Sequence, residues 1–132
     1  MKTLKVVSIV LASFLFIFVS CNNANSKLQG TWKVSKVDTK FDENTMTPEM
    51  IKQVVDLQKN TYFKIVDDSS MVIISDNNPH DARWSINKNN VILFHFKNSI
   101  GKPNILGTFK KGIIIAKSKT PLGTMTIYYE KE

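Results

Sequence analysis

The side chains of this sequence that could perform chemistry are few and lie far apart. His80 and Asp81 are adjacent, but neighbours on an extended strand point to opposite faces, so they are a poor catalytic dyad. Asp67 and Asp68 lie among turn-forming residues, where solvated acids are common. His95 has no second residue at metal-ligand spacing. No nucleophile motif or phosphate-binding loop is present. We therefore expect no enzymatic activity, no metal site and no cofactor.

Cys21 is the only cysteine of the chain, and it follows a segment typical of exported proteins. Two lysines precede an apolar run from Val6 to Val19, which falls short of the about 20 apolar residues that a membrane-spanning helix needs. We therefore interpret residues 1–20 as a secretory signal peptide. A single cysteine also excludes a disulfide framework within the chain.

Phe18-Val19-Ser20-Cys21 resembles the lipobox of bacterial lipoproteins, although Phe18 replaces the usual aliphatic residue. The resemblance implies that Cys21 becomes the N-terminus after cleavage and carries acyl chains such as palmitate. Several acyl chains, at about 0.8 kcal/mol per buried methylene, hold a protein at a membrane more firmly than one. The alternative is an ordinary secretory cleavage site, with a free thiol at Cys21.

The rest of the chain predicts one small domain. Residues 21–26 are the lipidated cysteine and a short polar tether, and residues 27–132 are long enough for a single core. The chain carries 18 Lys and Arg against 11 Asp and Glu, a formal net charge of +7. The lysines are scattered and lack the aromatic signature of RNA-binding domains, so we expect no nucleic-acid partner. We interpret the charge as solvation, with weak attraction to anionic head groups or polysaccharide.

Short runs rich in β-branched and aromatic residues follow one another along the domain, separated by turn-forming residues. The first contains Gly30 and Trp32, and Gly30 leaves room for the close approach of another backbone. Connections this short join antiparallel neighbours, so the fold class is mainly β, an eight-stranded antiparallel up-and-down barrel. The expected strands cover residues 28–37, 61–66, 71–75, 82–86, 91–96, 105–110, 112–118 and 124–130.

An amphipathic helix is predicted from Pro48 to Lys59, between the first and second strands. Thr47 can cap it, and Pro48 suits the first helical position. Its apolar stripe must be buried, and both ends of the helix connect to the same end of the barrel. We therefore expect the helix to lie across one barrel mouth as a plug or lid, with these side chains turned inward: Met50, Val54 and Leu57.

The order of these features resembles the small lipocalin-like lipoproteins of Gram-negative bacteria. The resemblance rests on the Gly30-x-Trp32 opening, the helix after the first strand, Trp84-Ser85-Ile86, and the final Ile127-Tyr128-Tyr129, and it covers about Lys27 to Glu132. It implies a barrel that binds a small, apolar molecule and a location at the outer membrane of a Gram-negative bacterium, anchored through the N-terminal lipid.

If Trp32 sets the inward phase, ten side chains face the barrel interior and are candidate ligand contacts. They are Trp32, Val34, Trp84, Ile86, Phe94, Phe96, Ile113, Ile115, Ile127 and Tyr129. The same side chains would equally fill the barrel as a core, in which case the domain would be an interaction or structural module with an envelope protein as its partner. We rank a carrier or sensor of an apolar molecule first, this module second, and a hydrolytic or haem-dependent enzyme third.

Overall fold

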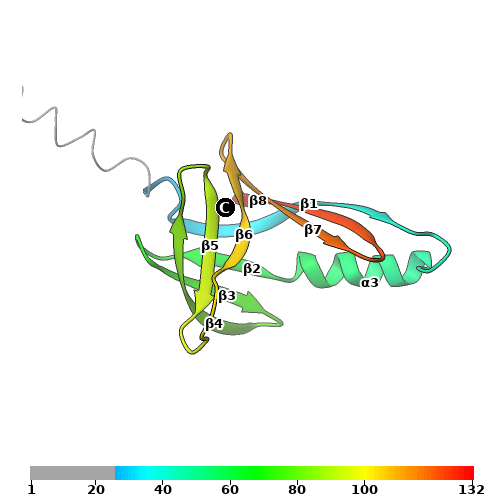
Figure 1. Ribbon diagram of the computed structural model, residues 1–132, viewed down its shortest axis with the longest axis horizontal. Helices are drawn as coiled ribbons and strands as arrows, with labels where there is room; N and C mark the ends of the chain where they lie inside the picture. The colour runs from blue at the N-terminus through cyan, green and yellow to red at the C-terminus, as the bar shows by residue number, and fades with distance from the viewer. Residues whose placement is uncertain (1–25) are drawn as a thin grey trace, which may run out of the picture.

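The computed structural model describes residues 26–132, which fold into eight strands and a helix between the first two (Figure 1). The predicted signal peptide and Cys21 lie outside the described residues. In chain order the elements are β1 (Gly30–Phe41), α3 (Pro48–Lys59), β2 (Tyr62–Ile65), β3 (Ser70–Ser75), β4 (Asn78–Ile86), β5 (Val91–Phe96), β6 (Asn104–Lys110), β7 (Ile113–Thr120) and β8 (Gly123–Lys131).

The predicted fold class is confirmed. Each strand pairs antiparallel with the next, and β8 pairs with β1, which closes the barrel. Because closure gives every strand two neighbours, it removes the exposed strand edges that invite aggregation. The strand order is that of the sequence, as expected for short hairpin connections.

Three strands extend past the rest of the barrel as a ribbon. Residues 30–32 of β1 pair with β2, whereas the pairing of β1 with β8 runs from Trp32 to Phe41. The pairing of β8 with β7 continues to Thr120, so β1, β8 and β7 form a three-stranded ribbon (Figure 1). A β-bulge between Val34 and Lys36 adds Ser35 to β1. The strand predicted to end at Val37 therefore runs to Phe41, because β8 supplies a partner for these four further residues.

The helix α3 forms where the sequence predicts it. The Thr47 side chain accepts a hydrogen bond from the Met50 backbone N–H at 3.2 Å, and Pro48 occupies the first turn. Figure 1 shows α3 alongside the protruding part of β1, the strand that it chiefly contacts. Among residues 26–132, no helix has the length and apolar character that a membrane span requires.

One end of the barrel is sealed by side chains. Leu28, just before β1, is fully buried, and its carbonyl accepts a hydrogen bond from Trp32 Nε1 at 2.8 Å. Gly30 has a φ of 136°, and a Cβ there would meet the side chain of Lys131. The close approach predicted at Gly30 therefore exists, but it comes from a side chain and not from a second backbone. At the opposite end, where β1 leads to α3, Phe96 is 38% exposed, and we call this end the open end.

Candidate functional site

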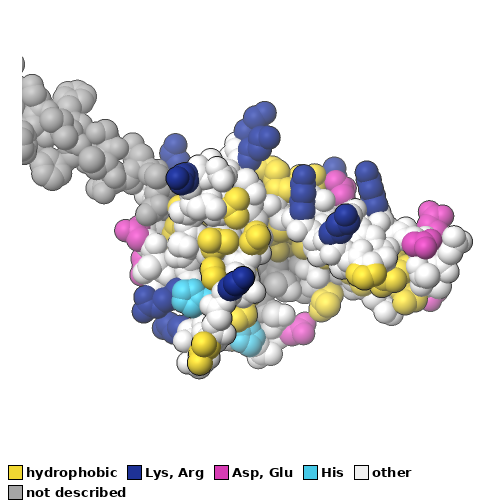
Figure 2. All heavy atoms as spheres, in the orientation of Figure 1, with side chains coloured by type: hydrophobic (Ala, Val, Ile, Leu, Met, Phe, Trp, Pro, Cys, Tyr) yellow, Lys and Arg dark blue, Asp and Glu magenta, His cyan; other side chains and the backbone are white. Residues whose placement is uncertain are grey.

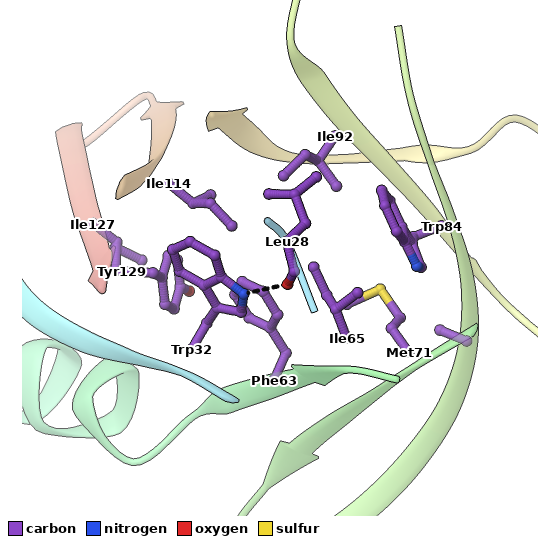
Figure 3. Packing of buried hydrophobic residues seen from close by; sticks show 11 residues of the cluster. Leu28, Trp32, Phe63, Ile65, Met71, Trp84, Ile92, Ile114, Ile127 and Tyr129 are labelled. Atoms are coloured by element: carbon purple, nitrogen blue, oxygen red, sulfur yellow. Dashed lines mark hydrogen bonds between the residues drawn. The ribbon is translucent and has the colours of Figure 1, made fainter. Parts of the chain in front are cut away.

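The interior of the barrel is built from side chains that converge from the surrounding strands (Figure 3). Four of the ten predicted interior residues are buried in this core: Trp32, Trp84, Ile127 and Tyr129. Three more pack against it and are half-buried: Val34, Ile86 and Phe94. The seven therefore lie where the sequence places them, inside the barrel. Their contact with a ligand stays a prediction.

Aromatic rings fill the centre of the core. The Trp32 and Phe63 rings are stacked with centroids 6.4 Å apart, and Phe63 meets Tyr129 edge-to-face at 4.9 Å. Phe109 also meets Trp32 edge-to-face, with ring centroids 6.2 Å apart. Burial raises the pKa of the Tyr129 phenol, because the charged phenolate would be poorly solvated there. This part of the interior is a packed core with an apolar character.

Trp84 and the turn between β2 and β3 are joined by hydrogen bonds. Trp84 Nε1 donates to the Asp67 carbonyl at 2.8 Å. The Asp67 carboxylate in turn accepts from the backbone N–H groups of Ser69 and Ser70, at 3.0 and 2.7 Å. These backbone hydrogen bonds lower the pKa of Asp67, whereas a general acid needs a raised one. Asp67 is therefore a structural turn residue.

The predicted phase of β7 is wrong. Ile114 is fully buried, whereas Ile113 and Ile115 lie outside the core cluster. Ile114 pairs with Phe109 and Tyr129, both of which face inward, and side chains of paired residues share one face. Ile113 and Ile115 therefore point outward. Three consecutive isoleucines give no alternation from which the phase could be read.

Several core residues were missed as well. They are Leu28, Phe63, Ile65, Met71, Ala82, Ile92 and Ile114. The alternation of β5 could have identified Ile92, which lies two residues before the predicted inward Phe94. Phe63 pairs directly with Trp32, so its inward position follows from the register, which the sequence does not give.

The interior becomes progressively exposed toward the open end. Along β5, Ile92 is fully buried, Phe94 is half-buried, and Phe96 is 38% exposed. Phe96 meets Phe94 edge-to-face at 5.6 Å and His80 at 6.2 Å. His80 pairs with Ile73, which packs against the core, so the imidazole lies on the inward side at the open end. The core row of β5 thus continues into an exposed aromatic group formed by Phe94, Phe96 and His80.

The helix does not bury the stripe that was predicted to plug the barrel. Met50 is 45% exposed and Leu57 is 51% exposed, while Val54 is half-buried. The helix packs beside β1 rather than into the core. Its half-buried apolar residues are Ile51, Val54 and Val55. The prediction that Met50 and Leu57 turn inward to be buried is therefore wrong. Their role in a lid stays a prediction.

The remaining polar candidates do not assemble into a site. Asp81 lies on the opposite face of β4 from His80 and makes a 4.0 Å ion pair with Lys97. His95 pairs with Arg83, which also points outward. Within the described part of the chain, no group of three His, Cys, Asp or Glu side chains is arranged to hold a metal ion.

Comparison with known proteins agrees with the architecture. A family described as the lipocalin-like domain matches residues 28–108, which is more than half of the 132-residue chain. Neither the curated proteins nor the solved structures include a match to this sequence. The matched segment begins at the buried Leu28 and runs through the first five strands into β6, and so includes most of the sealed core. With the closed eight-stranded barrel, this match establishes that the chain belongs to the lipocalin-like domain family.

Proposed function

We propose that the barrel binds one small, apolar molecule at its open end, in a lipoprotein that Cys21 anchors to a membrane of the cell envelope. The observation that carries the binding proposal is the inward row of β5. It continues from the buried Ile92 through Phe94 to the exposed Phe96 without a polar interruption. An apolar row that leaves a sealed core and reaches solvent gives an apolar molecule a surface to cover.

The open end also offers a polar contact. His80 stands beside the Phe96 ring, and an imidazole nitrogen can donate or accept a hydrogen bond. A mostly apolar ligand with one polar group would therefore place its apolar part against Phe94 and Phe96. Its polar group would meet His80. Lipocalin-like barrels are a binding fold, and this arrangement supports a carrier or sensor.

The anchor rests on the sequence. Lys2 and Lys5, the apolar run and Ser20-Cys21 occur in the order that lipoprotein processing requires. With the resemblance to small lipocalin-like lipoproteins, they support export and attachment to the outer membrane of a Gram-negative bacterium. The short tether of residues 22–26 would then keep the barrel close to that membrane.

Native mass spectrometry of the full-length protein, released from its membrane in mild detergent, tests the binding proposal directly. A carrier is expected to retain a small molecule of cellular origin. In parallel, binding of the apolar fluorophore N-phenyl-1-naphthylamine should weaken about tenfold in Phe96→Ala, because that ring is the exposed end of the apolar row.

The matched control is Val66→Ala. Val66 is also an exposed apolar residue, at 48%, but it follows β2 at the sealed end of the barrel. It should leave fluorophore binding unchanged. Equal binding by the wild type and Phe96→Ala would contradict a site at the open end.

The second candidate function is an interaction module with an envelope protein. Ile100 and Leu122 favour it, because both are large, exposed apolar residues in loops at the open end. Under this function the barrel would be empty in native mass spectrometry, and Ile100→Ser would weaken partner binding while Phe96→Ala left fluorophore binding unchanged.

A further inference from the structure

The outer face of the ribbon is a surface that the proposed function does not use. Outward residues form three rows across it: Lys36, Tyr128 and Ile115; Asp38, Thr126 and Lys117; and Lys40, Thr124 and Lys119. We call these nine residues the basic ribbon face. Figure 2 shows lysine side chains gathered over β1, β8 and β7. Lysines that are scattered in the sequence thus meet on one surface.

Three of these lysines are available for an anion. Lys36 is engaged, because its Nζ lies 3.5 Å from Asp38 Oδ2 and 5.6 Å from the centroid of the Tyr128 ring. Lys40, Lys117 and Lys119 are exposed and make no ion pair with any residue in the 26–132 range. Like charges gathered without counter-charges repel one another, and an anion that binds among them removes that repulsion.

The face is hollowed and not flat. Lys40, Lys117 and Lys119 line a hollow of about 530 Å³ together with the hydroxyls of Thr124 and Thr126. A second hollow of about 330 Å³ lies over β6 and β7 and is lined by Ile105, Lys110 and Ile115. Lys117 lines both hollows, so they adjoin. The hollows lie over four neighbouring strands, β1, β8, β7 and β6. Because neighbouring strands are about 4.8 Å apart, the lysines on them are spread over roughly 14 Å.

The side chains that line the two hollows indicate which kind of molecule the basic ribbon face recognises. Three unpaired ammonium groups and Lys110 attract carboxylates or sulfates, while the threonine hydroxyls and the Asp38 carboxylate can hydrogen-bond sugar hydroxyls. Tyr128 also lines this hollow, and its phenol can hydrogen-bond a sugar hydroxyl. Lysines spread over roughly 14 Å exceed what a single small anion needs and suit a linear polymer. We propose that the basic ribbon face binds an acidic polysaccharide.

Two other polyanions fit the face less well. Single-stranded nucleic acid is held by several aromatic rings on which bases stack, and this face has one tyrosine, with Lys36 over its ring. An anionic bilayer is flat at this scale, whereas the lysines line a hollow. Moreover, Asp38 and the threonines have no function against lipid phosphates, and Asp38 would repel them.

The test measures binding of the full-length protein in mild detergent to polygalacturonate, a polymer of sugar carboxylates, with neutral dextran as the uncharged reference. The wild type should bind polygalacturonate and not dextran, and its binding should weaken as salt rises. The double variant Lys117→Glu with Lys119→Glu should weaken this binding by about tenfold or more.

The matched control is Lys88→Glu with Lys102→Glu, which changes the net charge equally but lies in the β4–β5 turn and the β5–β6 loop. It should bind as the wild type does, and both variants should keep the circular dichroism spectrum of the barrel. Equal weakening by both variants would overturn the proposal, because net charge alone would then account for binding. Without binding to polygalacturonate, binding to oligo(dT), or binding to phosphatidylserine vesicles that Lys117→Glu with Lys119→Glu weakens, would also overturn it and assign the face to nucleic acid or to a membrane.

Discussion

At the scale of single residues, Trp32 organises the sealed end. Its indole packs against Phe63 and Phe109, and its Nε1 donates to the Leu28 carbonyl. A buried indole N–H without a partner would cost free energy, so Leu28 stabilises the tryptophan while covering the end of the barrel. This one interaction ties the segment before β1 to the core. A glycine at position 30 lets Lys131 pack beside it, with the Lys131 Nζ 5.8 Å from the Trp32 ring.

The inward phase of β7 gives a prediction with an internal control. Ile114→Ala should lower the free energy of unfolding by about 2–5 kcal/mol, because it leaves a cavity in a fully buried position. Ile115→Ala removes the same atoms from the outer face and should cost about 1 kcal/mol or less. Urea denaturation of the full-length protein measures both. Equal losses would mean that the two residues are buried alike and that the phase is wrong.

The turn residue Asp67 gives a prediction for pH dependence. Backbone hydrogen bonds lower its folded-state pKa below the model-peptide value of 3.8, so the ionised form stabilises the fold. This contribution is fully present above pH 3.8 and is lost as the pH falls through the lower, folded-state pKa. Thermal midpoints of the wild type and Asp67→Asn should therefore differ near neutral pH and converge in strong acid. A difference in thermal midpoint that is independent of pH would indicate that the ionisation of Asp67 does not contribute to the stability of the fold.

At the scale of elements, the sequence predicted the helix and the turns, because neighbouring residues determine both. The helix from Pro48 to Lys59 was predicted to the residue, because its cap and first turn are formed by Thr47 and Pro48 themselves. Turn residues located all the hairpins, although Asp76 and Asn77 alone make the β3–β4 turn, with φ values of 50° and 63°. Because Asn78 and Pro79 are also typical turn residues, the expected strand 82–86 misses the first four residues of β4.

What the sequence could not supply is pairing between distant segments. The extension of β1 to Phe41 depends on β8, which follows some eighty residues later. The burial of Ile114 depends on the register with Phe109 and Tyr129. The packing of α3 depends on the ribbon that this extension creates. For the same reason, four lysines that look dispersed in the sequence, Lys36, Lys40, Lys117 and Lys119, share one face.

The docking of α3 on β1 predicts that a half-buried and an exposed apolar residue of the helix respond differently to a charge. Val54→Asp should lower the free energy of unfolding by about 1–2 kcal/mol, since it forces a charge into a half-buried contact. Leu57→Asp introduces the same charge at a residue that is 51% exposed and should change stability by about 0.5 kcal/mol or less. Chemical denaturation compares them. An unchanged midpoint for Val54→Asp would show that the helix is not docked.

At the scale of the whole molecule, the two ends of the barrel and its outer ribbon expose different side chains. The N-terminal segment enters beside the sealed end, where Leu28 and Trp32 lie, whereas the aromatic group of Phe94, Phe96 and His80 lies at the open end. A protein anchored through residues before Ser26 would therefore hold its sealed end toward the membrane and its open end away from it. In that orientation a ligand would be exchanged with the surroundings and not directly with the bilayer.

Anchoring itself is the prediction on which this orientation depends. The full-length protein expressed in a Gram-negative host should be recovered in the membrane fraction, with an intact mass that corresponds to a mature chain beginning at acylated Cys21. Cys21→Ser removes the sulfur that the acyl chains require, so that variant should keep its signal peptide or be released as a soluble form.

Ser20→Ala, which retains a small residue before the cysteine, is the control and should still be processed and lipidated. A soluble wild-type protein with a free thiol at Cys21, or a Cys21→Ser variant that is processed and membrane-bound like the wild type, would contradict lipid anchoring. The barrel would then lose the proposed orientation, while the proposed binding of an apolar molecule at its open end would be unaffected.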